Sequence, residues 1–539
     1  MKSKIGICLI IPCVAGALCL TGCKKNQSKP HSKDGKAIIY IATYNGGVGY
    51  DWINTICARF NEQFADYTDA QLESKGLRGV EFRVDANESY YGENLESGLT
   101  ADIYFTEMVD YAYYARKGLF LDVSDVITSS LEDLGDTGSI EDKLDENLKN
   151  YLKCINNKYY GLPFYEGFYN LMYDVDLFDQ ELLFFDEEGV IGETSASEHL
   201  SKGPDNVAGT WDDGLPRTYE EFDTLMDNLS AQYTPIVLTG GTTSYVNRYI
   251  QNHFVNYEGK EQSLLNYNFN GTATDLGTVA NNGTVTKDET PTVISQYSQG
   301  AVLQKQLGKY YALDFLKNHM MNSNNLKTVS SHKEAQKDFI ATKYGGGSKS
   351  TRFGLIVEGT WWENEASTYL KADEAKGGGK LNRRFGVLPI PKVSDDEVGQ
   401  KQTVISLNSS FCFVAKNTTY PELSKNVFKF FHTNQSLSSF TASTSATRAF
   451  SYSIEDSDLP NTSYFAKQLI AMKETCDIVY PFSSDSHVLD KKSNFSMDKY
   501  PWSIGDVISN VYDQFVNNIE TPITYFRKMY TYATTWWNK

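Results

Sequence analysis

Strand-like and helix-like patterns of apolar residues alternate along the first part of the chain. Residues 37–42 (AIIYIA) form a continuous apolar run, and residues 80–84 (VEFRV) alternate with a period of two, as strands do. Between them, apolar residues recur at helical spacing over 51–67. A further strand is expected at 102–105 (DIYF), followed by a helix over 109–117. This order predicts parallel strand pairing and an α/β lobe.

A second set of elements begins near Tyr159. Thr218 and Glu221 have the spacing of a capping box, which predicts a helix over 219–229, and a strand is expected at 235–238. The remaining expected elements are strands at 171–173, 353–357, 384–388, 404–407 and 411–415, and two C-terminal helices at 504–519 and 523–536.

Two polar stretches interrupt this second set. Residues 186–214 and 256–300 are rich in Gly, Asn and Thr, and we interpret them as insertions or long surface loops. The glycine runs at 345–347 and 377–379 are interpreted as turns or hinges. Because 539 residues exceed what one compact core supports, two or more lobes are expected.

The first 22 residues have the pattern of a signal for export. Lys2 and Lys4 precede an apolar stretch over 5–20 that is short for a membrane span. The sequence Leu-Thr-Gly-Cys that ends at Cys23 resembles the lipobox of bacterial lipoproteins, which implies that Cys23 becomes the lipidated first residue of the mature chain. Residues 23–36 are then a flexible tether. An ordinary cleaved signal or a short anchor helix is the alternative, and both also export the body.

The charge balance argues against nucleic acid as a partner. The chain has 50 Lys+Arg and 68 Asp+Glu, and removal of residues 1–22 takes away two lysines, which leaves 48 against 68, a net charge of -20. Such a surface repels phosphate backbones and anionic lipids. No later run approaches the roughly 18 apolar residues of a membrane span, so membrane contact is expected only through the lipid.

The cysteines suggest no redox motif. Cys57, Cys154, Cys412 and Cys476 lie far apart, in no Cys-x-x-Cys pair. Cys57 and Cys412 fall in apolar segments and are interpreted as buried thiols. A disulfide between two of the four stays open, because spacing does not decide pairing.

Motifs of catalysis and cofactor binding are missing from the sequence. There is no Gly-x-Ser-x-Gly elbow and no His-Glu-x-x-His, and the seven histidines have no ligand spacing. We therefore expect no catalytic residue, no metal and no cofactor.

Aromatic residues are abundant, with 36 Tyr, 29 Phe and 7 Trp, and several stand beside acids and amides. This mixture suits carbohydrate, because a sugar ring stacks its C–H face on an aromatic ring while its hydroxyls need polar partners. Three clusters stand out, at 164–170, 358–365 and 500–502. Packing in the core is the alternative for any single ring. Trp361-Trp362 follows a predicted strand, where side chains project into a cleft.

Five segments in a fixed order give a resemblance to a known family. They are 45–49 (NGGVG), 101–123, 159–178, 216–222 and 358–391, the last of which contains Glu-Gly-Thr-Trp-Trp and Phe-Gly-Val-Leu-Pro-Ile-Pro. In this order, behind a lipobox, they resemble the extracellular solute-binding proteins of family 1, which serve carbohydrate ABC importers.

The resemblance implies an α/β, two-lobe periplasmic-binding-protein-like fold with a hinge and a ligand cleft between the lobes. By analogy, the first lobe takes 37–158 and 404–455, and the second takes 159–398 and 470–539, enlarged by the polar stretches. Such a protein captures an oligosaccharide by hinge closure and delivers it to the permease subunits of the importer. We expect a monomer, anchored by its lipid to the outer face of the bacterial cytoplasmic membrane.

The resemblance also suggests ligand-binding residues. Trp361 matches the family's stacking tryptophan, and Trp362 is its neighbour. The other candidates are Tyr165, Glu166 and Tyr169 from the second lobe, Asn45 and Glu107 at strand ends of the first, Arg448 in a cleft-directed loop, and Trp502 from the third aromatic cluster. Gly47 and Val48 stand where maltose-type members have an acid–lysine pair, which argues for an oligosaccharide other than maltodextrin.

Two other functions stay open. A secreted glycan-acting enzyme would need a catalytic carboxylate pair and would turn its substrate over. A receptor of the same fold for a peptide or polyol is the other, and an Arg-lined site for a terminal carboxylate would mark the peptide.

Overall fold

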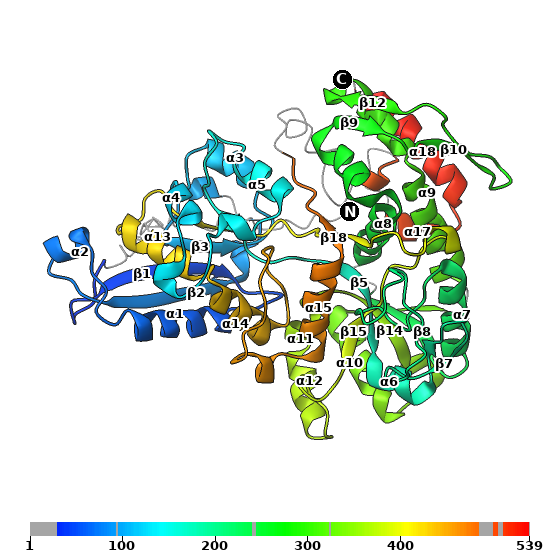
Figure 1. Cartoon of the computed structure of the whole chain (residues 1–539), viewed down its shortest axis with the longest axis horizontal. Helices are drawn as coiled ribbons and strands as arrows, with labels where there is room; N and C mark the ends of the chain where they lie inside the picture. The colour runs from blue at the N-terminus through cyan, green and yellow to red at the C-terminus, as the bar shows by residue number, and fades with distance from the viewer. Residues whose placement is uncertain are drawn as a thin grey trace, which may run out of the picture.

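The computed structural model describes residues 30–92, 95–239, 244–322, 325–483, 500–504 and 510–537. The predicted signal peptide, Cys23 and residues 24–29 of the predicted tether lie outside these residues. The prediction of a free tether is wrong for residues 30–36, because Pro30 and Gly35 accept backbone hydrogen bonds from Ile38 and Arg78, at 3.0 and 2.9 Å. Figure 1 shows two lobes side by side, each built on its own five-stranded sheet.

The first sheet has the strand order β2-β1-β3-β17-β4. Its strands are β1 (Ala37–Tyr44), β2 (Val80–Asn87), β3 (Ile103–Thr106), β4 (Leu162–Pro163) and β17 (Phe411–Val414). The first three pair in parallel, as the sequence predicts, and β17 runs antiparallel to β3 and β4.

Helix α1 (Asp51–Gln63) covers this sheet because its apolar residues share one face. Trp52 packs edge-on against Phe105 of β3 at 5.1 Å, and Phe60 against Phe430 at 5.3 Å. Phe430 ends α13 (Pro421–Phe430), which returns to this lobe with α14 (Asn434–Thr444) late in the chain. The smaller helices here are α2 (Ala70–Ser74), α3 (Tyr111–Arg116), α4 (Ser124–Thr128) and α5 (Glu146–Leu152).

The second sheet has the order β13-β8-β14-β5-β15. Its strands are β5 (Tyr169–Asp174), β8 (Thr234–Thr239), β13 (Leu326–Val329), β14 (Phe353–Gly359) and β15 (Phe385–Val387). The helices of this lobe include α6 (Val175–Glu181), α7 (Tyr219–Ser230), α10 (His332–Ala341), α11 (Trp362–Glu365), α12 (Ser367–Glu374) and α15 (Tyr464–Thr475). The predicted strands of this lobe are thus confirmed within a few residues.

Three stretches of chain connect the two lobes. Residues 164–168 connect β4 to β5, residues 406–410 connect β16 (Thr403–Ile405) to β17, and residues 445–463 connect α14 to α15. β16 pairs in parallel with β18 (Asp477–Val479), which follows α15. The predicted lobe boundaries stay predictions; the pairing places β4, which they assign to the second lobe, in the first sheet.

The polar stretch 256–300 differs from the prediction of a surface loop, which is wrong for residues 256–268. They continue α8 (Ser244–Asn268) past a break at Gly259, where φ is +75°. Asn252 and Asn256 of this helix are buried and accept the backbone N–H groups of Ile405 and Thr403, at 2.9 and 3.2 Å. These polar side chains therefore bind the backbone of β16 and do not face solvent.

A subdomain follows α8. Two antiparallel pairs, β9 (Asn270–Ala273) with β12 (Thr292–Ser295) and β10 (Gly277–Val279) with β11 (Val285–Lys287), pack with α9 (Leu307–Asp314) and the C-terminal α18 (Pro522–Trp536). The predicted helix 523–536 is confirmed. Within the predicted helix 504–519, the described residues form only α17 (Val511–Val516).

The capping box of α7 is half formed. The Thr218 hydroxyl accepts the backbone N–H of Glu221, as predicted. The Glu221 carboxylate, however, accepts from the backbone N–H of Arg217, at 2.7 Å, and pairs with the guanidinium of that residue. A charged partner one residue earlier takes the carboxylate away from the cap.

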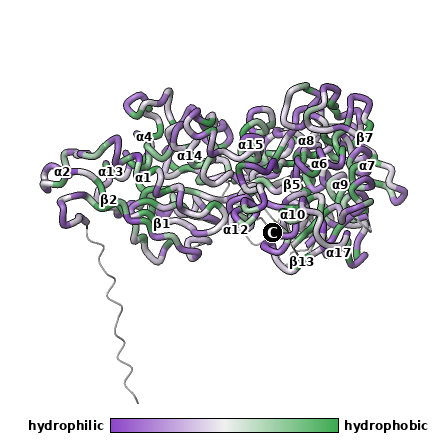
Figure 2. Tube along the Cα trace, turned by 90° about the horizontal axis from the view of Figure 1, so that it is seen from below, coloured by the Kyte–Doolittle hydropathy of each residue, from purple (hydrophilic) through white to green (hydrophobic). Residues whose placement is uncertain are grey.

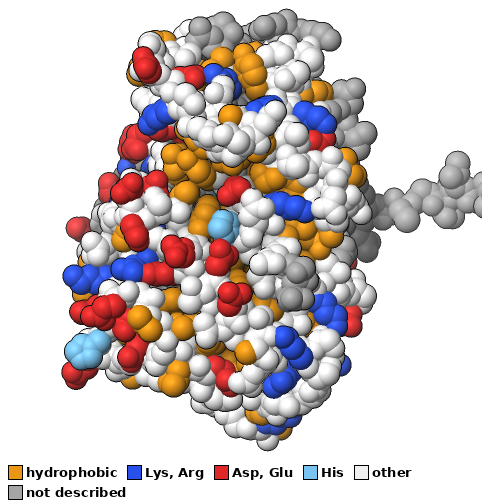
Figure 3. All heavy atoms as spheres, turned by 90° about the vertical axis from the view of Figure 1, so that its right-hand side faces the viewer, with side chains coloured by type: hydrophobic (Ala, Val, Ile, Leu, Met, Phe, Trp, Pro, Cys, Tyr) orange, Lys and Arg blue, Asp and Glu red, His pale blue; other side chains and the backbone are white. Residues whose placement is uncertain are grey.

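Hydrophobic stretches lie inside both lobes, and hydrophilic residues follow the outer loops (Figure 2). Asp and Glu side chains gather along one side of the face in Figure 3, in line with the net charge of -18. The four cysteines of the described residues are free thiols, and Cys57 and Cys412 are buried, as expected. Of the described helices, none combines the length and hydrophobicity that crossing a bilayer requires.

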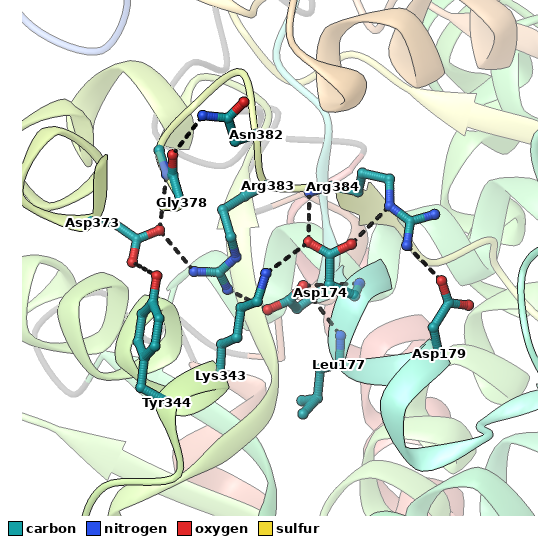
Figure 4. A network of polar contacts seen from close by, with 12 residues as sticks. Asp174, Leu177, Asp179, Lys343, Tyr344, Asp373, Gly378, Asn382, Arg383 and Arg384 are labelled. Atoms are coloured by element: carbon teal, nitrogen blue, oxygen red, sulfur yellow. Dashed lines mark hydrogen bonds and ion pairs between the residues drawn. The ribbon is translucent and has the colours of Figure 1, made fainter. Parts of the chain in front are cut away.

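A buried arginine ties β5 to α12 in the second lobe (Figure 4). Arg383 has no exposed surface and pairs with Asp174 at the end of β5 and with Asp373 of α12, the latter at 3.0 Å. Tyr344 donates a hydrogen bond to the same Asp373. The neighbouring Arg384, whose side chain is 39% exposed, pairs with Asp176 and Asp179 at the surface.

We predict that Arg383→Met destabilises the protein by ~3–5 kcal/mol, because it leaves two buried carboxylates without their cation. Arg384→Met is the matched control, and its half-exposed pairs are worth about 1 kcal/mol or less. Urea unfolding followed by circular dichroism measures both free energies. Equal losses for the two variants would contradict the assignment of Arg383 as the structural arginine.

Candidate functional site

A cavity of about 300 Å³ lies between the two lobes. Its walls come from the residues that follow the carboxyl ends of β1, β3 and β14, and from the start of α8 after β8. The crossing segments contribute Tyr165, Leu407 and Asn408. Ligand sites of open α/β sheets lie at this edge, because loops there are free of the sheet's own hydrogen bonds.

Trp361 forms the centre of the aromatic wall. It follows β14 directly, and three tyrosine rings meet it nearly at right angles: Tyr169 at 5.2 Å, Tyr165 at 6.1 Å and Tyr245 at 6.4 Å. Trp361 is 6% exposed, so most of its indole surface is covered by protein. Perpendicular rings of this kind hold one another in fixed orientations.

Two glycines allow the indole to lie against the backbone. A Cβ at Gly359 would come within 2.4 Å of the Trp361 ring, and one at Gly167 within 2.9 Å of it. Any side chain at either position would push the ring out of place. The Gly359-Thr360-Trp361 sequence therefore sets the position of the tryptophan.

Polar groups lie at the edge of the aromatic wall. The Tyr165 hydroxyl donates to the carboxylate of Glu107, which follows β3. Arg248 of α8 donates to the Tyr169 hydroxyl, and its guanidinium lies 4.8 Å from the centroid of the Tyr169 ring. Asn408 also lines the cavity. Aromatic faces beside carboxylate, amide and guanidinium groups form the surface that a sugar needs.

The carboxyl groups at this site have pKa values above their ordinary range. Burial raises the pKa of Glu107 to about 7, the charge on Glu365 adds to this effect, and the Tyr165 hydroxyl and Arg248 oppose it. Burial also raises the pKa of Glu365, which lines the same cavity, and the pKa of Glu358 behind it. Ionising all three together is therefore unfavourable.

A hydrogen bond joins the two lobes across the cavity rim. Asn364 of α11 donates to the backbone oxygen of Gly47 in the loop after β1, at 2.6 Å. Gly47 has φ +49°, and a Cβ there would come within 3.1 Å of the Tyr165 hydroxyl. Both lobes thus contribute to one continuous wall.

Of the residues suggested by the sequence, Trp361, Tyr165, Tyr169 and Glu107 line this cavity together. Trp362, Glu166, Asn45, Arg448 and Trp502 are not among its lining residues. Asn45 is exposed beside the cavity loop.

The four other residues outside the cavity are buried with protein partners. Trp362 packs in the core of the second lobe against Phe339, Phe385 and Phe465. Arg448 bonds His432, at 2.9 Å, and the backbone of Pro163. Trp502 donates to the backbone oxygen of Asn247, at 3.1 Å. Glu166 pairs with Lys473, at 2.7 Å. Adjacent residues in extended chain face opposite sides, so Glu166 points away from the cavity that Tyr165 lines.

Sequence reasoning missed several residues of the wall. These are Tyr44, Gly47, Tyr91, Met108, Ser244, Tyr245, Arg248, Glu365, Leu407 and Asn408. Glu365 belongs to the aromatic cluster at 358–365 and Gly47 to the segment 45–49, although neither is among the candidate site residues; Tyr44 and Met108 are the neighbours of Asn45 and Glu107. Tyr245 and Arg248 begin a helix with no motif, and only the fold brings them to the site.

No three His, Cys, Asp or Glu side chains in the described part of the chain are placed to hold a metal ion together. The site as described is an aromatic cavity with acidic and amide edges, and the arrangement is suited to binding.

Two α/β lobes around a cavity that both of them line define a binding protein of the two-lobe class. The chain belongs to the bacterial extracellular solute-binding protein family, whose model matches residues 79–436. The membership predicted from the five segments is therefore confirmed. No curated protein matches the sequence at a significant level.

Solved structures agree on the fold. Apo RafE from Streptococcus pneumoniae superposes with a TM-score of 0.53 at 12% identity, covering 93% of this chain and 98% of its own. A chitin oligosaccharide binding protein gives 0.52 at 15%, covering 94% and 100%. MalE from Xanthomonas citri gives 0.51 at 12%, covering 92% and 96%. The two-lobe α/β fold predicted from the sequence is confirmed.

We predict that Glu107→Gln raises the stability of the protein relative to the unsubstituted protein, and that this gain is larger at pH 8 than at pH 5. The folded pKa of about 7 lies above the ordinary value of roughly 4.3, so the stability contributed by protonated Glu107 is lost as the pH rises through 7. Glutamine does not ionise and loses nothing, an advantage of up to ~3 kcal/mol. Melting midpoints of both proteins at pH 5 and pH 8 measure it. Glu374→Gln, on the exposed side of α12, is the control. A stability difference between Glu107→Gln and the unsubstituted protein that is the same at pH 5 and pH 8 would contradict the prediction.

Proposed function

We propose that this protein is a lipid-anchored receptor that captures an oligosaccharide in the cavity between its lobes and delivers it to an ABC importer. The family supports the extracellular binding role. The observation that carries the sugar ligand is the cavity itself: Trp361 and three tyrosines beside Glu107, Asn408 and Arg248. Solved relatives of the same fold include RafE in complex with raffinose and the chitin oligosaccharide binding protein.

Hinge closure is part of the proposal. Glu107 and Gly47 come from the first lobe, and Trp361 and Arg248 from the second, so a ligand touches all of them only when the lobes are together. Binding then favours the closed state by its differential affinity. The permease would meet the outer ends of the lobes in that state, and the receptor acts as a monomer.

Two observations keep the alternatives open. Glu107 and Glu365 both line the cavity, and a glycan-acting enzyme would need such a carboxylate pair. Arg248 also lines it and could meet the carboxylate of a peptide. A ligand carboxylate would meet one arginine beside two acids, whose raised pKa values any further negative charge would raise again.

We predict that the protein from residue 24 to 539 is stabilised by one class of oligosaccharide. A ligand at 100 times its dissociation constant adds about 2.7 kcal/mol of stability, which raises the melting midpoint. A thermal-shift screen against neutral and amino oligosaccharides, polyols and short peptides measures this, followed by chromatography of the sugars. An intact sugar that shifts the midpoint supports the receptor. Cleaved sugar contradicts it in favour of the enzyme, and a shift with peptides alone contradicts the sugar ligand.

The matched variants are Trp361→Ala and Trp211→Ala. Loss of the central stacking ring should reduce the sugar-induced shift, because one aromatic pair contributes roughly 0.5–1.5 kcal/mol beyond its buried area. Trp211 donates its ring N–H to Thr475, away from the cavity, and its loss should leave the shift in place. Equal shifts in the two variants would place the ligand elsewhere.

We predict that Cys23→Ser releases the protein from the membrane. The Leu-Thr-Gly-Cys sequence supports lipid attachment at this thiol, and serine offers no thiol for a thioether. Fractionation of bacteria that express the full chain, with incorporation of labelled palmitate, measures it. Cys57→Ser is the control, because Cys57 is buried in the first lobe. Label retained in Cys23→Ser would exclude the anchor at this residue.

A further inference from the structure

Three carboxyl side chains gather at one side of the cavity. Glu107 follows β3, Glu365 ends α11, and Glu358 lies behind Glu365 near the end of β14. Glu107 is 7% exposed and Glu358 is fully buried. Two lobes and three elements thus bring negative charge to one wall, and Glu107 and Glu365 act on each other electrostatically.

The hydrogen-bond partners of these acids are neutral. Glu107 accepts from the Tyr165 hydroxyl. The Gln336 amide donates to Glu358 and to Glu365, at 3.3 and 3.4 Å. Within the described residues, none of the three acids forms an ion pair with Lys, Arg or His.

Buried acids elsewhere in the chain fall into two groups: Asp212, Glu258 and Glu363 are held by neutral hydrogen-bond donors, and others have cations. Asp174 pairs with Arg383, and Glu166 with Lys473. Both of those carboxylates support the structure, and neither lines the cavity. Burying a carboxylate without an opposite charge is costly, and like charges nearby increase the cost.

The charged and titratable groups that face Glu107 do not remove this cost. They are Tyr44, Tyr165, Arg248 and Glu365. Arg248 lowers the pKa of Glu107, yet burial and Glu365 outweigh it, and the guanidinium is already engaged with Tyr169. Lys333 likewise lowers the pKa of Glu365, but burial outweighs it and the net shift is upward.

We propose that the ligand carries a basic nitrogen, as in an oligosaccharide with free amino groups, and that Glu107 and Glu365 hold this nitrogen as a cation. This inference rests on the proposed function and names the substrate class of the same cavity. An ammonium group brings three donors and the opposite charge, and hydrogen bonds between charged groups are about twice as strong as neutral ones. The hydroxyls of a neutral sugar bring donors but leave the repulsion between the acids.

The test uses three β-1,4-linked trisaccharides that differ at carbon 2: the glucosamine trimer, its fully N-acetylated form and cellotriose. Isothermal titration at pH 7 with the protein from residue 24 to 539 measures the affinities. We expect the glucosamine trimer to bind at least ~10-fold tighter than either neutral sugar. Equal or tighter binding of a neutral trimer overturns the inference and leaves the proposed function standing.

Variants separate the cavity from the general negative charge of the protein. Glu107→Gln and Glu365→Gln should each reduce the preference for the amine by ~10-fold, and Glu374→Gln should leave the ratio unchanged. A preference that persists in both cavity variants reflects the net charge alone and overturns the inference.

Failure of the two proposals gives different results. If none of the three trimers binds while a neutral sugar from the wider screen does, the inference is overturned and the oligosaccharide receptor stands. If no sugar of either kind binds, both proposals fall.

Discussion

The Glu166 carboxylate lies buried where the chain crosses between the lobes. It accepts hydrogen bonds from Thr447, at 2.8 Å, and Tyr480, at 2.6 Å, and pairs with Lys473, at 2.7 Å. These partners come from α15, from the residue after β18 and from the segment between α14 and α15, all about 280 residues or more from Glu166 in the sequence. Because an unpaired charge at this depth would cost several kcal/mol, the cluster favours one arrangement of the crossing segments.

The cavity depends on that arrangement. The backbone of Glu166 donates to Thr447, and Leu407 donates to Gly167, both at 2.9 Å, so the crossing segments are joined as in a short sheet. With Glu166 turned to the buried pair, Tyr165 must face the other side, where it meets Glu107 and Trp361. The residue that fixes the crossing and the residue that lines the site are thus neighbours in the chain.

Much of the fold could be predicted from local pattern. β1, β2 and α1 follow from apolar periodicity, because one face or both faces of each are buried. The pattern failed at residues 256–268, where Asn256 holds the backbone of β16 inside the protein, as Asn252 does one helical turn earlier. Polar side chains used in this way resemble those of a surface loop, since sequence does not show which backbone groups need partners.

Trp361 and Trp362 show where prediction of the site stopped. The sequence determined the class of protein, the two lobes and the break after β14 that places a tryptophan at the cavity, because these depend on local pattern and on segment order. Only the tertiary structure decided that Trp361 lines the cavity while Trp362 packs against Phe385 in the core, 4.9 Å between ring centroids. It also brought Glu107 and Arg248 to that wall from different lobes. The physical reason is that a site between lobes is made by contacts distant in sequence, and these are set by how the segments pack.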